Sequence, residues 1–147
     1  MKVLILNGVN LNLTGKRERS VYGVKTLEEI NAEIAAYAKI RGVDTEFYQS
    51  NLEGELVNKL HEAFLNKSCD AILLNAGAFT HYSYALRDAI AAIDIPVVEV
   101  HISNVHAREE FRKNSVLSEV CAGTVFGFGV GSYIAAIEGL KYRAENK

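Results

Sequence analysis

The segment "DAILLNA", residues 70–76, is apolar from Ala71 to Leu74 and ends in Asn75 and Ala76. An amphipathic strand alternates apolar and polar residues, whereas a continuous apolar run is typical of a strand buried on both faces of a parallel sheet. The segment "IPVVEVH", residues 95–101, has the same character, because valines surround its single glutamate. These two segments predict strands of a parallel sheet that has helices on both faces.

Patterns typical of strands and helices alternate along the rest of the chain. Three further segments predict strands, namely "KVLIL" at 2–6, "VDTEFYQ" at 43–49 and "AGTVFGF" at 122–128. Apolar residues recur at helical spacing between them, and a capping box of Thr26 and Glu29 begins the first long helix, which Gly42 ends. A short helix is predicted near "AREEFR", residues 107–112. Five alternating strands predict an α/β fold with a doubly wound parallel sheet, in one domain of residues 1–147.

Composition argues against several classes of function. A formal net charge of −2 gives no long-range attraction to nucleic acid. The apolar run at the amino terminus is too short for a signal peptide, and no segment is long enough to span a membrane. Cys69 and Cys121 match no metal-binding spacing and have apolar neighbours, which favours reduced thiols. We expect a cytoplasmic protein that binds neither nucleic acid nor a membrane.

Polar residues gather directly after the predicted strands, where parallel α/β sheets bind ligands. The segment "EVHISNVHAREEFR", residues 99–112, is the richest of these, and the loop over residues 7–23 is long enough to predict a functional or mobile segment. Amides bind hydroxyl groups, and arginines bind carboxylates. The residues therefore predict a site for a small polyhydroxylated anion, with acid–base chemistry and no cofactor. The amides and arginines are Asn10, Asn12, Arg17, Arg19, Asn75, Arg108 and Arg112.

Other chemistries have weaker support in the sequence. The segment "GFGVGS", residues 127–132, follows the last strand without a nucleotide-binding fingerprint, and close backbone packing explains its glycines. No G-x-S-x-G motif is present, and Lys16 is the only lysine in a strand-end loop, which disfavours a hydrolase and an imine mechanism. No H-E-x-x-H or H-x-H pair supports a metal site. The groups considered as metal ligands were His81, His101, His106, Asp88 and Glu99.

Four segments, in order, resemble the type II 3-dehydroquinate dehydratases. They are "NGVNLNLTGKRE" at 7–18 with "YG" at 22–23, "QSNLEGEL" at 49–56, "NAGAFTHYSYALRDA" at 75–89 and "EVHISNVHAREEFR" at 99–112. The resemblance implies a flavodoxin-like fold with three layers, α/β/α, and a homododecamer built as a tetramer of trimers. It also implies anti elimination of water from 3-dehydroquinate through an enolate, giving 3-dehydroshikimate without a metal or cofactor. The same reaction serves aromatic amino acid biosynthesis by the shikimate pathway and quinate breakdown, between which the sequence does not decide.

The resemblance also implies roles for individual residues. Tyr22 would take the proton from C2, with Arg17 as the cation that favours its phenolate and Asn10 stabilising the enolate. His101 would protonate the departing C1 hydroxyl, and Glu99 would hold His101 from behind. Strand alternation places Glu99 and His101 on the same side of their strand, in agreement with this pairing. The substrate would be bound by Asn75, His81, Ile102, Ser103, Arg108, Arg112 and, from a neighbouring subunit, Asp88.

Several alternatives remain open at the level of sequence. Tyr22 could anchor its loop against the surface, and His106 could merely begin a helix. Arg19 stands where the family usually has proline, and we favour a solvent-exposed side chain over a second cation near the site. His61 is expected to be a partly exposed helical residue. A non-catalytic receiver or flavin carrier is disfavoured, because asparagines stand where a receiver needs carboxylates and no Ser/Thr-rich phosphate loop is present.

Overall fold

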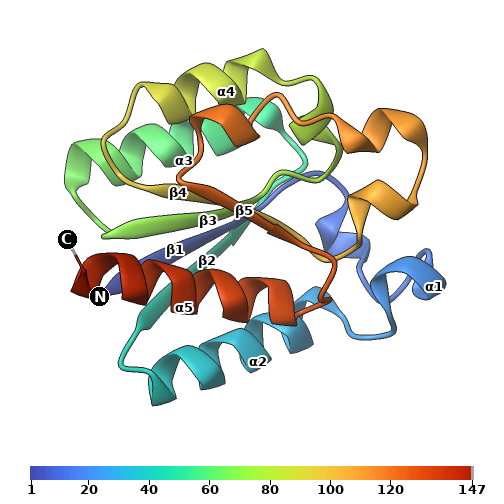
Figure 1. Ribbon diagram of the computed structural model, residues 1–147, viewed down its shortest axis with the longest axis horizontal. Helices are drawn as coiled ribbons and strands as arrows, with labels where there is room; N and C mark the ends of the chain where they lie inside the picture. Colours follow the sequence, from blue (N-terminus) through green and yellow to red (C-terminus); the bar gives the residue numbers. More distant parts are fainter. Residues whose placement is uncertain (147) are drawn as a thin grey trace.

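The computed structural model describes residues 1–146, which form a five-stranded parallel sheet in the order β2-β1-β3-β4-β5 (Figure 1). The strands are β1 (Lys2–Asn7), β2 (Asp44–Gln49), β3 (Ala71–Asn75), β4 (Val97–His101) and β5 (Gly123–Phe126). The helices are α1 (Arg19–Tyr22), α2 (Leu27–Ile40), α3 (Glu53–Asn66), α4 (Tyr84–Ala91) and α5 (Gly131–Glu145). This order confirms the predicted doubly wound sheet.

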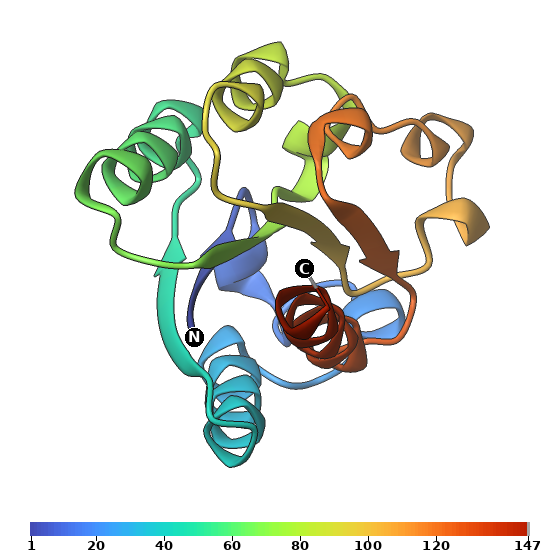
Figure 2. The ribbon, with the colours of Figure 1, turned by 60° about the vertical axis from the view of Figure 1, so that its left-hand side comes forward.

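Helices cover both faces of the sheet, so that the molecule has three layers (Figures 1 and 2). Successive β1 residues show why, because Val3 and Ile5 pack in the core under α2 and α5, whereas Leu4 and Leu6 pack in the core under α3 and α4. Every residue of β3 and β4 is buried, as their apolar sequences predicted. The flavodoxin-like fold is therefore confirmed.

Local signals in the sequence fix several element boundaries. The Thr26 side chain accepts the backbone N–H of Glu29, and the Glu29 side chain accepts the backbone N–H of Thr26, which confirms the predicted capping box. The short helix predicted near residues 107–112 is present as 3-10 structure that is divided in two. Two 3-10 turns stand there, η3 (Val105–Ala107) and η4 (Glu110–Lys113), because the extended backbone of Arg108 separates them.

Further 3-10 turns connect the strands to the helices. They are η1 (Leu11–Leu13), η2 (Gly77–His81) and η5 (Ser118–Val120). Together with α1, η3 and η4, the turns η1 and η2 gather at the carboxyl ends of the strands, on the right of Figure 1, while both termini lie at the opposite edge. None of the helices within residues 1–146 has the length and apolarity needed to cross a membrane.

Candidate active site

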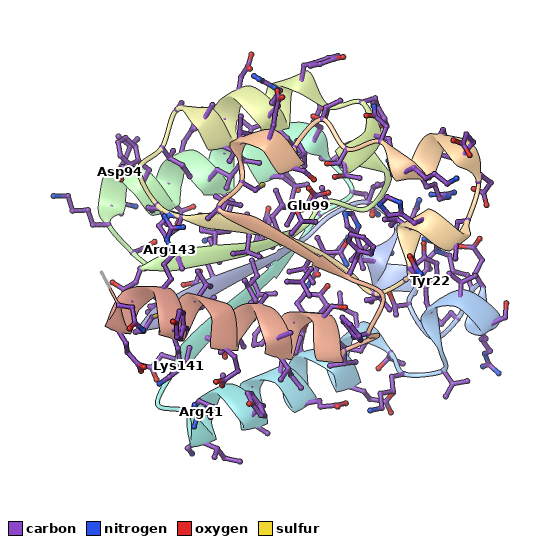
Figure 3. The ribbon with its side chains drawn as sticks, in the orientation of Figure 1. Tyr22, Arg41, Asp94, Glu99, Lys141 and Arg143 are labelled. Atoms are coloured by element: carbon purple, nitrogen blue, oxygen red, sulfur yellow. The ribbon has the colours of Figure 1, made fainter. Side chains whose placement is uncertain are left out.

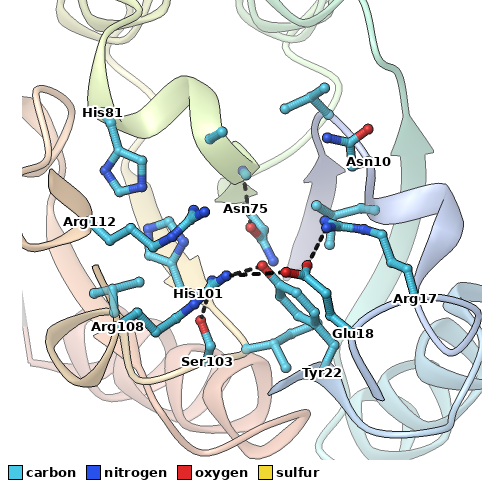
Figure 4. A pocket seen from close by; sticks show the side chains of 16 residues that line it. Asn10, Arg17, Glu18, Tyr22, Asn75, His81, His101, Ser103, Arg108 and Arg112 are labelled. Carbon is cyan, nitrogen blue, oxygen red and sulfur yellow. Dashed lines mark hydrogen bonds and ion pairs between the residues drawn. The ribbon is translucent and has the colours of Figure 1, made fainter. Parts of the chain in front are cut away.

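A cavity opens at the carboxyl ends of β1, β3 and β4 and is covered by the segment that carries α1 (Figure 4). It lies where the strand order reverses between β1 and β3, the usual ligand position in such sheets. Most of the residues singled out in the sequence line it together. They are Asn10, Arg17, Tyr22, Asn75, His81, His101, Ile102, Ser103, Arg108 and Arg112.

Two glycines allow the loops after β1 and β3 to meet at this cavity. A Cβ atom on Gly8 would overlap the carbonyl of Ala76, and a Cβ atom on Gly77 would lie 2.7 Å from the carbonyl oxygen of Val9. Gly77 also has a positive φ of 63°, which side chains rarely adopt. Backbone therefore packs against backbone here, and this contact brings the loop of Asn10 beside the end of β3.

Tyr22 lies on α1 with two guanidinium groups against it. Arg108 Nη1 donates a hydrogen bond to the Tyr22 hydroxyl oxygen at 2.9 Å and contacts Ser103 Oγ at 3.3 Å. The Arg17 guanidinium instead stacks 5.0 Å from the centre of the Tyr22 ring, and its Nη1 donates to the carboxylate of Glu18. The structure thus places Arg108, and not Arg17, in direct contact with the Tyr22 oxygen.

His101 ends β4 and is held from behind by a buried carboxylate. Its Nε2 lies 2.7 Å from Glu99 Oε1, and the Glu99 residue is only 1% exposed. Burial would raise the pKa of Glu99, but hydrogen bonds from His101, Ser118 and Thr80 outweigh burial and lower this pKa to about 2. Because an ionised carboxylate only accepts hydrogen bonds, Nε2 carries a proton and Nδ1 is the ring nitrogen left for the cavity.

A second histidine and an arginine form the wall beside η4. His81 Nδ1 donates to the backbone carbonyl of Asn114 at 2.8 Å, which leaves Nε2 for a ligand. Burial lowers the pKa of His81, so a neutral ring that both donates and accepts is favoured there. Arg112 lines the same cavity, and its Nε donates to Glu109 at 2.5 Å. These groups suit a ligand that carries hydroxyl groups and a negative charge.

Asn75 is oriented by residues that the sequence analysis did not select. Its Nδ2 donates to the Tyr133 hydroxyl at 2.8 Å, and that hydroxyl donates to Asn7 Oδ1 at 2.7 Å. Tyr133 is fully buried, and burial raises the pKa of its hydroxyl, which keeps the group neutral. The only signal in the sequence was a tyrosine among the apolar residues of the last helix, which predicts core packing rather than a role behind a site.

Asp88 is one of two predicted site residues that do not line the cavity in a single chain. It lies on α4 with a side chain that is 78% exposed, 3.3 Å from Arg87. The family resemblance implies that Asp88 acts at the site of a neighbouring subunit, for which an exposed position on α4 is required. Glu99 also does not line this cavity, because it lies in the interior and contacts His101 from behind (Figure 3).

The remaining candidates lie outside the cavity. His106 stacks on Phe126 with ring centres 5.1 Å apart, and His61 is exposed on α3. Arg19 is exposed, as favoured from the sequence, and its Nε donates to the carbonyl of Gly15 at 3.2 Å. Within residues 1–146, no three His, Cys, Asp or Glu side chains are grouped closely enough to hold a metal ion.

Known proteins resemble this chain over nearly its whole length. The family described as dehydroquinase class II matches residues 1–141. A 3-dehydroquinate dehydratase from Caldicellulosiruptor bescii is 53% identical over 140 residues, covering 95% of this chain and 96% of that protein. One from Pelotomaculum thermopropionicum is 56% identical over 137 residues, covering 93% and 94%. The crystal structure of a type II dehydroquinase from Butyrivibrio crossotus has a TM-score of 0.93 and 48% identity, covering 96% of this chain and 97% of that one.

The likeness reaches the site as well as the fold, because the matched residues include every segment that lines the cavity. The identity to these relatives is also far above the level at which only a fold is shared. On these grounds the chain belongs to the class II dehydroquinase family.

Proposed function

We propose that this member of the class II dehydroquinase family is a hydro-lyase that converts 3-dehydroquinate to 3-dehydroshikimate, with Tyr22 as the base and His101 as the acid. The observation that carries the proposal is that the Tyr22 hydroxyl and the His101 ring line the same cavity, each with a charged partner of its own. Two separate groups suit an elimination, in which one proton leaves carbon while another reaches the departing oxygen.

The first step is removal of a proton from C2 by the Tyr22 phenolate. An isolated tyrosine is ionised in only about one molecule in a thousand at pH 7, so a tyrosine base needs a cation beside it. The Arg108 guanidinium donates directly to the Tyr22 oxygen, and Arg17 stacks on the ring, so both favour the phenolate. The C–H electrons move into an enolate with its charge on the C3 oxygen, which Asn10 would stabilise.

The second step breaks the bond between C1 and its hydroxyl oxygen. Hydroxide leaves poorly, so His101 gives a proton to this oxygen and water departs as the C1–C2 double bond forms. Since Nε2 is bonded to Glu99, the transferred proton sits on Nδ1, and the acid is the imidazolium form of His101. Glu99 stabilises that cation. After the reaction Tyr22 holds the proton from C2 and His101 has lost its Nδ1 proton, and exchange with solvent returns both residues to their starting forms.

The other cavity residues bind the substrate. Asn75, His81 and Arg112 offer donors to its hydroxyl groups and carboxylate, together with the backbone of Ile102 and Ser103. We further propose a cytoplasmic homododecamer built from trimers, in which Asp88 of each subunit reaches the site of its neighbour. The proposed reaction is a step of aromatic amino acid biosynthesis by the shikimate pathway and equally a step of quinate breakdown.

The reaction itself is tested by mixing the protein with 3-dehydroquinate and following the ultraviolet absorbance of the conjugated product. We expect product formation, and borohydride added with the substrate should leave activity intact, because an enolate mechanism forms no imine that borohydride could trap. Absence of product from the folded protein would contradict the proposed reaction. Irreversible, substrate-dependent inactivation by borohydride would contradict the enolate mechanism alone.

Asp88→Ala tests the contribution from a neighbouring subunit. We expect KM to rise by a larger factor than kcat falls, because a contact made equally to substrate and transition state affects binding rather than chemistry. Steady-state kinetics with 3-dehydroquinate would measure both constants. Asp94→Ala is the matched control, since Asp94 is exposed in the turn after α4. An unchanged KM in Asp88→Ala would show that this contact is not made.

A further inference from the structure

The carboxylate of Glu99 receives hydrogen bonds from three hydroxyl groups as well as from His101. Ser118 Oγ donates to Oε2 at 2.5 Å, Ser115 Oγ lies 2.9 Å from each carboxylate oxygen, and Thr80 Oγ1 donates to Oε1. His101 Nε2 adds the fourth contact at 2.7 Å. An ion pair between Glu99 and His101 does not require these hydroxyl groups, so they have a further effect on the pair.

These hydroxyl groups come from separate parts of the chain. Thr80 belongs to η2 after β3, Ser115 lies between η4 and η5, and Ser118 begins η5. Ser115 also accepts the backbone N–H groups of Leu117 and Ser118, each at 3.1 Å, so it shapes its own turn. The side-chain hydroxyl groups of Thr80 and Ser118 also donate to Glu99, but within residues 1–146 they accept no backbone N–H group as Ser115 does. Replacing Thr80 or Ser118 therefore disturbs the local backbone less than replacing Ser115.

The hydroxyl donors change how strongly Glu99 attracts the proton of His101. A buried carboxylate with one partner concentrates its negative charge on that partner, whereas added donors spread the charge over several hydrogen bonds. An acid that protonates a leaving group must hold its proton firmly enough to carry it and loosely enough to give it up. The number of donors on Glu99 therefore adjusts the acid strength of the imidazolium.

We propose that Thr80 and Ser118 are positioning residues for the acid: through Glu99 they fix the Nε2–H form of His101 and weaken the hold of the carboxylate on the imidazolium. The proposal rests on the proposed function, because it concerns the acid of that reaction. Neither residue lines the main cavity, so their effect on substrate binding is expected to be small.

Other charged or titratable groups surround the Glu99–His101 pair, and their effects on the pH profile have to be distinguished from those of the pair. Burial lowers the pKa of His81 and raises the pKa of Cys121 to about 12, so both side chains are expected to be neutral in the pH range where the basic limb is measured. His106 is distinguished by its own resonance in an NMR experiment. The charged or titratable side chains that line the two cavities touching His101 are Arg17, Glu18, Tyr22, His81, His106, Arg108, Arg112 and Lys113.

Ser118→Ala removes one donor from Glu99 and is the principal test. We expect kcat to fall by about 5-fold to 30-fold, the factor that corresponds to a loss of about 1–2 kcal/mol, with KM nearly unchanged. The basic limb of the kcat–pH profile should move to higher pH, because an imidazolium held more tightly stays protonated further up the pH scale. A purely structural role would lower kcat without moving this limb.

Three further variants complete the test. Thr80→Val is nearly isosteric and should move the basic limb in the same direction as Ser118→Ala. Ser118→Thr keeps a hydroxyl group at position 118, so its basic limb should lie where that of the unmodified enzyme lies. Thr124→Val is the matched control, because Thr124 Oγ1 lies 3.3 Å from Ser118 Oγ and donates to no atom of Glu99. We expect its pH profile to match the unmodified enzyme.

Imidazole nitrogen NMR provides a readout that does not depend on turnover. In the unmodified protein we expect the His101 proton on Nε2, and in Ser118→Ala and Thr80→Val we expect the His101 titration to move to higher pH. Unmoved His101 titration and unmoved basic limbs in both variants would overturn the proposal. If the variants gave the expected NMR response but the unmodified protein did not dehydrate 3-dehydroquinate, the proposed function would be overturned instead.

Discussion

Replacement of His101 by alanine is expected to reduce kcat by about 10²-fold to 10⁴-fold, the usual contribution of a general acid. The leaving group is a hydroxide unless it is protonated, and His101 is the histidine that both lines the cavity and contacts a buried carboxylate. Substrate should still bind measurably, because the arginines and amides of the cavity remain. Steady-state kinetics, together with binding of 3-dehydroquinate to the variant, would measure both effects.

His106→Ala is the matched control for this loss. His106 is close in sequence, but its ring stacks on Phe126 and does not line the cavity of Tyr22 and His101. We expect kcat within about twofold of the unmodified enzyme for this exposed surface change. Near-normal kcat in His101→Ala would remove His101 from the role of acid, and a large loss in His106→Ala would indicate that a different histidine protonates the leaving group.

The sequence predicts most of the fold because its signals are local. The apolar run of β3 and the valines of β4 predict burial on both faces, which indicates a parallel sheet between helices. The capping box at Thr26 involves residues three positions apart, so it also is visible in the sequence. The short helix expected near residues 107–112 is divided into two 3-10 turns, and Arg108, whose extended backbone separates them, contacts the distant residue Tyr22.

The edge at which the site lies was predictable, but the partners of its residues were not. Strand ends of a parallel sheet meet at one edge, which is why Asn75 and His101 could be placed together in advance. Arg17 and Arg108 both lie in loops, and no periodicity says which of them reaches the Tyr22 oxygen. Serine and threonine are common on protein surfaces, so nothing in the sequence distinguishes Ser118. Its contact with Glu99 depends on the tertiary path of the segment before β5.

Tyr22→Phe is expected to reduce kcat by about 10²-fold to 10⁴-fold, because it removes the only atom of this side chain that can take a proton. The ring itself is retained, so its packing against the core and its stacking with Arg17 should persist. Tyr22 could otherwise be only an anchor for the segment over the cavity. In that case Tyr22→Phe would keep near-normal kcat, and Tyr22→Ala alone would lose activity.

The arginines beside Tyr22 supply the sharper part of this test. A base acts when deprotonated, so loss of the cation that favours the phenolate should move the acidic limb of kcat/KM to higher pH. Both guanidinium groups lie over the Tyr22 ring, but of the two Arg108 alone also donates to the Tyr22 oxygen, so Arg108→Gln should move the limb further than Arg17→Gln.

Two controls separate this electrostatic effect from loss of structure. Ser103→Ala removes the other partner of Arg108 Nη1 without removing a charge, and Arg19→Ala removes an exposed charge that does not line the cavity. Neither variant should move the acidic limb, although Ser103→Ala can raise KM through the substrate contacts of that loop. A limb that follows Arg17 and not Arg108 would show that the hydrogen bond from Arg108 to the Tyr22 oxygen does not sustain the phenolate. A limb that follows Arg19 would place the decisive cation outside the cavity and contradict both assignments.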